Sequence, residues 1–290
     1  MKQLKIVVLA KQVPDTRNVG KDAMKEDGTV NRAALPAIFN PEDLNALEQA
    51  LSLKERYGAT VTVLTMGPSR AADVIREAMY RGADGGVLLT DRKFAGSDTL
   101  ATSYAISCAI RKMGADIIVA GRQAIDGDTA QVGPQVAEKL GLPQVTYTEE
   151  IESLDGDKLT IRRHIEGGIE RVTTTFPVVI TVGSSAPVCR PRNAKCVMRY
   201  KHARTTSEIQ ALEEDYYPAL REARGYLNIP EWGVADVDAE DASLGLSGSP
   251  TKVKQIENIV FQAKEAKKLT SSDEDINSLI RELITAHAIG

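Results

Sequence analysis

The sequence contains few of the residues that build metal centres. Three histidines lie far apart and outside any HExxH pattern, so a histidine-rich metal site is not expected: His164, His202 and His287. Three cysteines stand in no paired metal-ligand spacing and are expected to be structural thiols: Cys108, Cys189 and Cys196. The sequence therefore predicts no metal site.

Aromatic side chains and positive charge are also scarce. Aromatic residues make up 4% of the chain, and the formal net charge is -4 at pH 7. Few aromatic rings leave few platforms on which bases could stack, and net negative charge opposes binding to a phosphate backbone. We therefore expect no nucleic-acid partner.

Long apolar runs are missing as well. No run approaches the roughly 20 residues that a membrane-spanning helix needs. Residues 1–12 pass directly into a strand-like apolar run without a small-residue cleavage site, which favours structure over a signal peptide. We expect a cytoplasmic protein without a membrane span.

What the sequence does contain, up to about residue 185, is an alternation of short apolar runs and amphipathic stretches. This pattern is typical of βαβ units and a parallel sheet. Strands are expected at 4–10, 60–66, 85–90, 116–121 and 176–182, and helices at 41–57 and about 70–80, 98–113 and 130–140. Asn40 is expected to cap the first helix, with Pro41 in its first turn and Gly58 after its end.

The remaining segments extend this core. Alternating runs punctuated by glycine between 146 and 175 predict antiparallel hairpin strands at a sheet edge. Dispersed apolar residues after 204, before two terminal helices, predict an arm that relies on another chain for burial. We expect an α/β Rossmann-like domain at 1–186, a basic partner-recognition region at 187–204 and a C-terminal arm at 205–290.

Ligands of parallel α/β sheets bind beyond the carboxyl ends of the strands, so the segment after the fourth strand is a candidate site. Gly121 allows close backbone approach, and Asp128 with Gln131 resembles a capping box. Such a helix start could bind phosphate, while the Asp126 and Asp128 side chains could accept hydrogen bonds from ribose hydroxyls or backbone amides. The alternatives are an ordinary capped turn, or a cap at Gly133 because Pro134 fits only a first turn.

The segment after the third strand is a second candidate. It places Ser97, Thr99, Thr102 and Ser103 around a helix start, with Asp98 as the expected cap. Hydroxyls at a helix start favour anions, although a solvated first turn has the same composition. No dinucleotide glycine fingerprint, Walker loop or hydrolase triad is present, so the residues themselves indicate only a nucleotide-like ligand.

A basic run occupies residues 190–204 of this acidic chain. Two interpretations remain open for it: a solvated face, or a docking surface that steers an acidic partner.

Taken together, these segments resemble the electron-transfer flavoprotein β-subunit family over nearly the whole chain. The motifs are VVLAKQVPDT (7–16), FNPEDLNALEQALSLKE (39–55), TMGPS (65–69), GRQAIDGDTAQVGPQVAEKLGLPQVT (121–146) and GSPTKV (248–253). The resemblance implies a heterodimer with an α-subunit that carries one FAD, while the β-subunit holds an adenine nucleotide.

The segment DRKFAGSDTLATS (91–103) is similar to that of electron-bifurcating members. The resemblance then implies a second, complete FAD in the β-subunit, with NADH as electron donor, ferredoxin or flavodoxin as low-potential acceptor, and an acyl-CoA dehydrogenase or quinone-linked oxidoreductase beyond the α-subunit. A conventional member with AMP is the first alternative. An ATP-cleaving or nucleotide-sensing protein of adenine-nucleotide α-hydrolase-like architecture is the second.

The resemblance also implies cofactor-binding residues and no catalytic residue within this chain. The expected cofactor contacts are Leu9, Asn40, Pro41, Glu42, Asp43, Met66, Asp98, Thr99, Thr102, Ser103, Gly121, Arg122, Gln123, Ala124, Ile125, Asp126, Gly127, Asp128, Thr129, Ala130, Gln131 and Val132. The family's partner-recognition loop corresponds to about 187–198.

Overall fold

The structure is a computed structural model that describes residues 3–15, 36–212, 216–251, 267–286 and 288–289. The chain divides into two compact units, Met1–Lys254 and Gln255–Gly290. Within the described ranges, no helix has the length and apolar character needed to cross a membrane. Nor do three or more histidine, cysteine, aspartate or glutamate side chains of those ranges gather into a group that could hold a metal ion.

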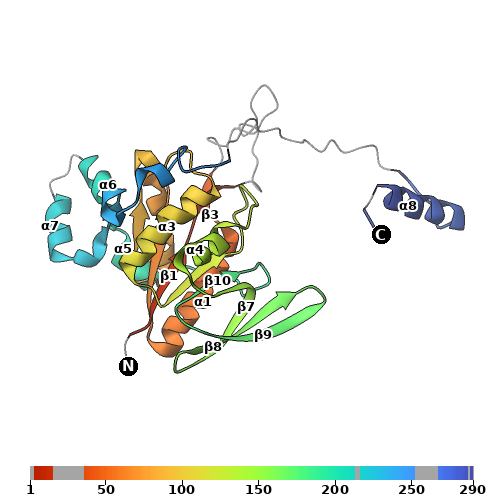
Figure 1. Cartoon of the computed structure of the whole chain (residues 1–290), viewed down its shortest axis with the longest axis horizontal. Coiled ribbons are helices and arrows are strands. Elements are labelled where there is room, and N and C mark those ends of the chain that lie inside the picture. The colour runs from red at the N-terminus through yellow and green to blue at the C-terminus, as the bar shows by residue number, and fades with distance from the viewer. Residues whose placement is uncertain (1–2, 16–35, 213–215, 252–266, 287, 290) are drawn as a thin grey trace. The chain divides into compact units, whose positions relative to one another are not determined.

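The first unit is built on a nine-stranded sheet (Figure 1). Its core runs in the order β5 (Gly85–Leu89), β4 (Thr60–Met66), β1 (Lys5–Leu9), β6 (Ile117–Gly121) and β10 (Val178–Val182). Each neighbouring pair in this series is parallel. The expected strands and the α/β fold class are confirmed, and the strand order is that of a doubly wound sheet.

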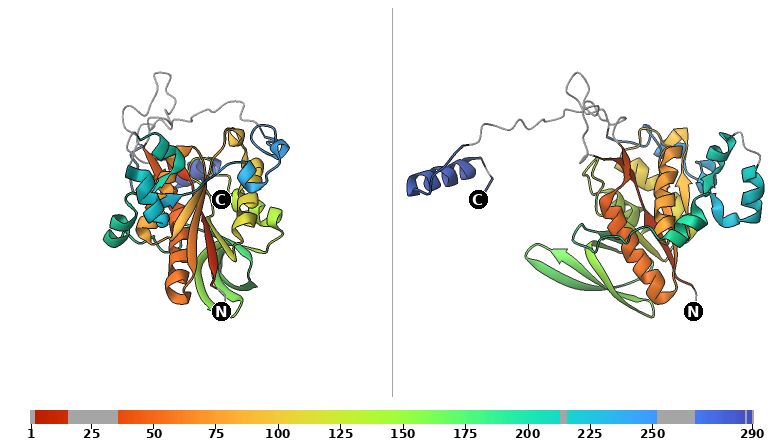
Figure 2. Two further views of the ribbon diagram at one scale, coloured as in Figure 1. Left: turned by 90° about the vertical axis from the view of Figure 1, so that its left-hand side faces the viewer. Right: turned by 180° about the vertical axis from the view of Figure 1, so that it is seen from behind.

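Helices cover both faces of the parallel core. On one face α1 (Pro41–Tyr57) and α2 (Ala72–Arg81) pack over one apolar cluster, and on the other α3 (Thr99–Met113) and α4 (Val132–Leu140) pack over a second (Figures 1 and 2). Strand β1 shows why the strands are continuously apolar. Ile6 and Val8 enter the first cluster, whereas Val7 and Leu9 enter the second.

The connection from β1 to α1 passes through β2 (Gln12–Pro14) and β3 (Ala37–Phe39), which pair antiparallel. Helix α1 begins at Pro41 and ends at Tyr57, and the following residue, Gly58, closes the last turn with a φ of 68°. The expected bounds of this helix are therefore confirmed.

An antiparallel extension lies at one edge of the sheet. Strand β7 (Gln144–Asp155) pairs in parallel with β10, and β8 (Lys158–Ile165) and β9 (Gly168–Thr175) follow it in antiparallel order. Figure 2 shows this hairpin extending away from the helices that cover the sheet. The expected edge hairpins are confirmed.

The expected boundary at residue 205 is not where the structure divides the chain. The elements after it include β11 (Arg204–Thr205), α6 (Thr206–Gln210), α7 (Tyr216–Ala223), β12 (Asn228–Ile229) and β13 (Glu231–Trp232). Strand β13 pairs with β5 and extends the sheet. Apolar side chains that are dispersed in sequence therefore reach the core of the first unit: Leu227, Ile229, Val234, Val237 and Leu244.

The second unit contains α8 (Asp273–Thr285). This helix is one of the two terminal helices expected from the sequence. Residues 252–266, where the other was expected, lie outside the described residues.

Candidate functional site

The candidate site lies at the carboxyl edge of the sheet. Leu9, Met66 and Gly121 each end a parallel strand: β1, β4 and β6. Strands β1 and β6 are neighbours, and the order of the sheet reverses between them. In doubly wound sheets this reversal opens a crevice in which ligands bind. The structure thus brings the expected loops to one edge.

The start of α1 holds the loop that follows β6. Three of its side chains accept alternate backbone N–H groups: Gly121 donates to Asp43 (3.1 Å), Gln123 to Glu42 (2.8 Å) and Ile125 to Asn40 (3.1 Å). All three accepting side chains are buried. The Asn40, Glu42 and Asp43 side chains therefore position the loop.

Asn40 also shows why its expected capping role is wrong. It stands at the N-cap position of α1, but its side chain makes no capping bond. The amide instead donates to the carbonyl of Gln123 (2.9 Å) while its oxygen accepts from Ile125. The side-chain nitrogen and oxygen of Asn40 thus both hydrogen-bond to the loop after β6.

Asp43 ties the ends of β1 and β6 together. Its Oδ2 accepts the N–H of Lys11 (2.8 Å), and its Oδ1 accepts the N–H of Gly121. Burial raises the pKa of Asp43 to about 7, against the opposing effect of hydrogen bonds from Asn40, Lys11 and Gly121. A Cβ on Gly121 would lie 2.3 Å from Oδ1 of Asp43, so only glycine fits there.

Lys11 was missed in the sequence reasoning. Its Nζ lies 2.7 and 2.8 Å from the two carboxylate oxygens of Asp126, across the neighbouring ends of β1 and β6. The ion pair offsets the charge that Asp126 would otherwise present to an anionic ligand. The position of Lys11 directly after an apolar strand was the available signal.

The expected capping box of Asp128 and Gln131 is wrong. Asp128 has a left-handed φ of 50°, and its carboxylate accepts from the side-chain amide of Gln123 (3.0 Å). Helix α4 begins at Val132, after Gln131, which makes no side-chain capping bond. Because no side chain caps this helix, the N–H groups of its first turn suit an anion.

The alternative cap at Gly133 is also wrong. Gly133 lies inside α4, where a Cβ would come within 2.5 Å of the Thr181 side chain. The glycine thus allows α4 to pack closely against β10, and Pro134 occupies the first turn as expected.

Asp98 caps α3, as predicted. Its Oδ1 accepts the N–H groups of Leu100 (2.9 Å) and Ala101 (3.0 Å). Burial works against ionisation of Asp98, but the bonds from Ala101, Thr251 and Leu100 hold its pKa below the usual value. These amides are consequently occupied by a carboxylate.

The hydroxyls around the start of α3 have different surroundings. Ser103 is buried and donates to the carbonyl of Leu100 (2.8 Å), while Thr102 is half-buried. Thr99 donates to the side chain of Gln131 (2.9 Å). Of these three hydroxyls, that of Thr99 is the one that bridges α3 to the start of α4.

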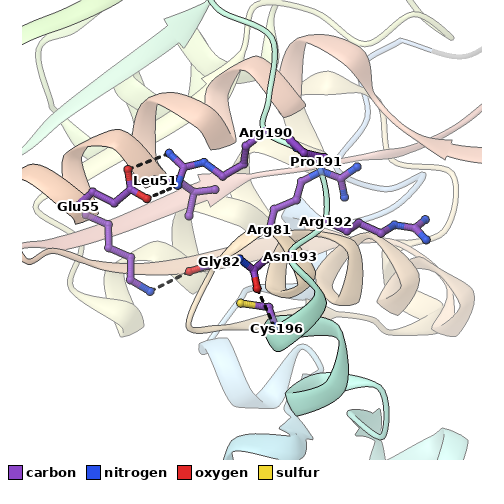
Figure 3. Close-up of a pocket in the computed structure, with 10 residues that line it drawn as sticks. Leu51, Glu55, Arg81, Gly82, Arg190, Pro191, Arg192, Asn193 and Cys196 are labelled. Atoms are coloured by element: carbon purple, nitrogen blue, oxygen red, sulfur yellow. Dashed lines mark hydrogen bonds and ion pairs between the residues drawn. The ribbon is translucent and has the colours of Figure 1, made fainter.

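Part of the basic run is paired within the chain. Arg190 forms ion pairs with Glu48 (2.8 Å) and Glu55 of α1, and Arg192 pairs with Glu77 of α2 (2.5 Å). Figure 3 shows Arg190 directed toward Glu55. Both residues line a pocket of about 380 Å³. These two arginines anchor the segment before α5 (Ala194–Tyr200) and are not simply solvated charges.

Fold and edge loops together define a doubly wound α/β protein of Rossmann type, with its candidate ligand crevice where the strand order reverses. Residues 27–213 match the family described as electron transfer flavoprotein domain. The chain belongs to the electron-transfer flavoprotein family, in its β-subunit branch. Membership of this branch implies an α-subunit as partner and a role in electron transport.

Three relatives illustrate the likeness. The chain is 53% identical over 289 residues to the acryloyl-CoA reductase electron transfer subunit gamma of Anaerotignum propionicum, covering 99% of this chain and 100% of the relative. It is 47% identical over 254 residues to an electron transfer flavoprotein subunit beta of Clostridium acetobutylicum, covering 87% of each. It is 42% identical over 289 residues to protein FixA of Azorhizobium caulinodans, covering 96% and 93%.

Proposed function

We propose that this chain is the β-subunit of an electron-bifurcating flavoprotein and that it holds a complete FAD at the carboxyl edge of the sheet. The isoalloxazine would supply two-electron redox chemistry, with NADH as donor and with ferredoxin or flavodoxin and the α-subunit FAD as acceptors. Because NADH and ferredoxin are soluble carriers of the cell interior, the chemistry is assigned to the cytoplasm.

One observation carries the proposal: the segment expected in bifurcating members is joined to the loop after β6. Thr99 donates to Gln131 (2.9 Å), and the side chain of Gln135 donates to Thr99 (3.4 Å). Residues 91–103 and 121–132 therefore border one site. A ligand that extends past a single phosphate would contact both.

The donor and acceptor groups at this edge suit a dinucleotide. The uncapped start of α4 offers N–H groups to the pyrophosphate, and the backbone near Gly121 allows close approach. Among the described residues, Gln135 Oε1 is a buried acceptor without a hydrogen-bond partner, which suits a ligand hydroxyl. Asp128 and Ala130 hold left-handed backbone conformations, a strain that persists where a site needs it.

Each polar side chain has a distinct task in this proposal. Asn40, Glu42 and Asp43 hold the loop through its backbone, and Lys11 offsets the charge of Asp126. These residues position the loop and neutralise the Asp126 charge, while backbone N–H groups and Thr99 face the cofactor.

A conventional member with AMP is supported by a separate observation. The first amides of α3 are occupied by Asp98, whereas no side chain caps α4, so of these two helix starts the one that offers free N–H groups to phosphate is that of α4. A mononucleotide with one phosphate matches the free N–H groups at this single helix start.

The number of flavins per heterodimer distinguishes a bifurcating member from a conventional member with AMP. Co-expressed with its α-subunit, the chain is expected to yield two FADs per heterodimer, one of which NADH reduces. Thr99→Val should lower FAD occupancy at the β-subunit site several-fold, by roughly the loss of one hydrogen bond to the site. Ser97→Ala is the matched control, because the Ser97 hydroxyl donates to Phe94 within its own loop. One FAD plus AMP would contradict bifurcation.

The segment at 187–198 supports docking of a redox partner. Val188 and Met198 are 88% and 64% exposed, although both are apolar. Arg190 anchors the stretch between them to α1. Exposed apolar side chains on an anchored segment are typical of protein contacts. With one relative named for an acryloyl-CoA reductase, an acyl-CoA dehydrogenase is the favoured high-potential partner, and a quinone-linked oxidoreductase the alternative.

Helix α8 supports contact with the α-subunit. Its apolar residues recur at intervals of three and four and so form one stripe: Ile276, Leu279, Ile280, Leu283 and Ile284. Within α8 no residue is buried, and the Ile280 side chain is 42% exposed. A stripe of this kind needs a partner surface to be stable in water.

Ile280→Asp is therefore expected to weaken assembly with the α-subunit by about tenfold to a hundredfold, since a buried charge replaces an apolar contact. Ser278→Asp adds the same charge on the opposite face of α8 and should leave assembly within about threefold. Dissociation constants from titration of the purified subunits measure both. Equal effects of the two variants would refute the contact.

A further inference from the structure

The last described residues of the first unit pack tightly against the loop that precedes α3. Gly245 has a left-handed φ of 54°, and a Cβ there would lie 2.4 Å from the carbonyl oxygen of Lys93. Gly96 has a φ of 76°, and a Cβ there would lie 2.8 Å from the Leu246 side chain. The two loops approach too closely for any larger residue at these positions.

Hydrogen bonds then join this segment to the cap of α3. Oδ2 of Asp98 accepts both the N–H (3.1 Å) and the hydroxyl (2.7 Å) of Thr251. The N–H of Asp98 donates to the hydroxyl of Ser249 (2.8 Å), which in turn donates to the carbonyl of Gly245 (2.6 Å). Ser249 is 5% exposed. We call Asp98, Ser249 and Thr251 the arm latch.

The latch continues into the candidate site. The second carboxylate oxygen of Asp98 holds the first amides of α3, and the next residue, Thr99, donates to Gln131 at the start of α4. One series of bonds therefore runs from Thr251 through Asp98 and Thr99 to the residue that precedes α4. Thr251 is also the last described residue before the second unit.

We infer that Ser249 and Thr251 are positioning residues for the nucleotide site and that the latch couples cofactor binding to the packing of residues 245–251 against the start of α3. This inference rests on the proposed nucleotide site. Because linkage is reciprocal, a nucleotide that fixes the starts of α3 and α4 also tightens the latch, and a broken latch weakens the nucleotide. The cofactor and the packing of residues 245–251 thereby stabilise one another.

The test uses the heterodimer and removes one hydroxyl. Thr251→Val keeps the shape and the N–H of Thr251 but loses the donor to Asp98. FAD and AMP, titrated separately by calorimetry after cofactor removal, are expected to bind the β-subunit site about tenfold more weakly. Thr251→Ser keeps the hydroxyl donor and should bind both nucleotides within about twofold of the wild type. Ser247→Ala is the control, because it removes an exposed hydroxyl in the same loop, and it should also stay within about twofold of the wild type.

A second measurement separates coupling from a structural role. Hydrogen exchange of the Thr251, Leu100 and Ala101 amides is expected to slow when FAD or AMP saturates the wild-type heterodimer, and to slow less in Thr251→Val. Unchanged affinity in Thr251→Val overturns the positioning role. Weaker affinity without any nucleotide effect on Thr251 exchange overturns the coupling. If the wild-type site binds neither nucleotide, the proposed function fails instead, and that result is seen before any variant is compared.

Discussion

Gly121→Ala is expected to destabilise the first unit by about 2–3 kcal/mol and to weaken nucleotide binding at least about tenfold. The added methyl would lie 2.3 Å from Oδ1 of Asp43 and 2.7 Å from the backbone nitrogen of Asp43. The backbone at the start of α1 cannot move away easily, because the same turn holds Gln123 and Ile125. Urea unfolding and nucleotide titration measure the two effects.

Gly127→Ala is the matched control for this substitution. Gly127 lies in the same loop, but a Cβ there would meet no atom within 4 Å. Its expected effect on stability is within about 1 kcal/mol. A loss of stability as large in Gly127→Ala as in Gly121→Ala would show that the loop tolerates no side chain anywhere. The specific contact with Asp43 would then not be the cause.

The second large effect is a pH dependence of stability centred on Asp43. Burial raises its pKa to about 7 in the folded protein, whereas the ordinary value is 3.8. Between these two values the folded state binds the proton more tightly than the unfolded state. The free energy of unfolding is therefore expected to fall as pH rises from about 4 to about 7, by roughly 1.4 kcal/mol per unit at most.

Asp43→Asn isolates this contribution, because asparagine does not titrate. Its amide can accept only one of the two N–H groups that Asp43 accepts, so a constant loss of about 1–3 kcal/mol is expected as well. Urea unfolding at pH 5, 6 and 7 should show a difference between wild type and variant that shrinks as pH rises. A difference that stays constant across this range would contradict the raised pKa.

Much of the fold followed from local pattern. The parallel strands were predictable because β1, β4 and β6 are buried on both faces and therefore read as continuous apolar runs. Helix α1 was predictable to its ends, since Pro41 and Gly58 act through their own backbone preferences. The cap of α3 by Asp98 is likewise a contact within three residues.

The site was predicted less completely, because its contacts are long-range. Asn40 and Asp128 are both residue types that favour helix caps. The Asn40 side chain instead accepts a hydrogen bond from Ile125, and the Asp128 side chain accepts one from Gln123. A side chain with several possible partners takes the one that the packing of the sheet brings near, and that choice leaves no local signal. The packing of Leu227 and Val234 into the core of the first unit left no local signal for the same reason.

The sequence by itself determined the class of fold, the edge of the sheet that carries the proposed ligand site and, through its motifs, the family. The tertiary structure decided which groups at that edge remain available. It showed that the acidic start of α1 holds the loop after β6, that Asp98 closes the start of α3, and that α4 begins without a cap. Periodicity reports burial of successive residues, whereas the partners of polar groups depend on segments up to 153 residues apart, as between Asp98 and Thr251.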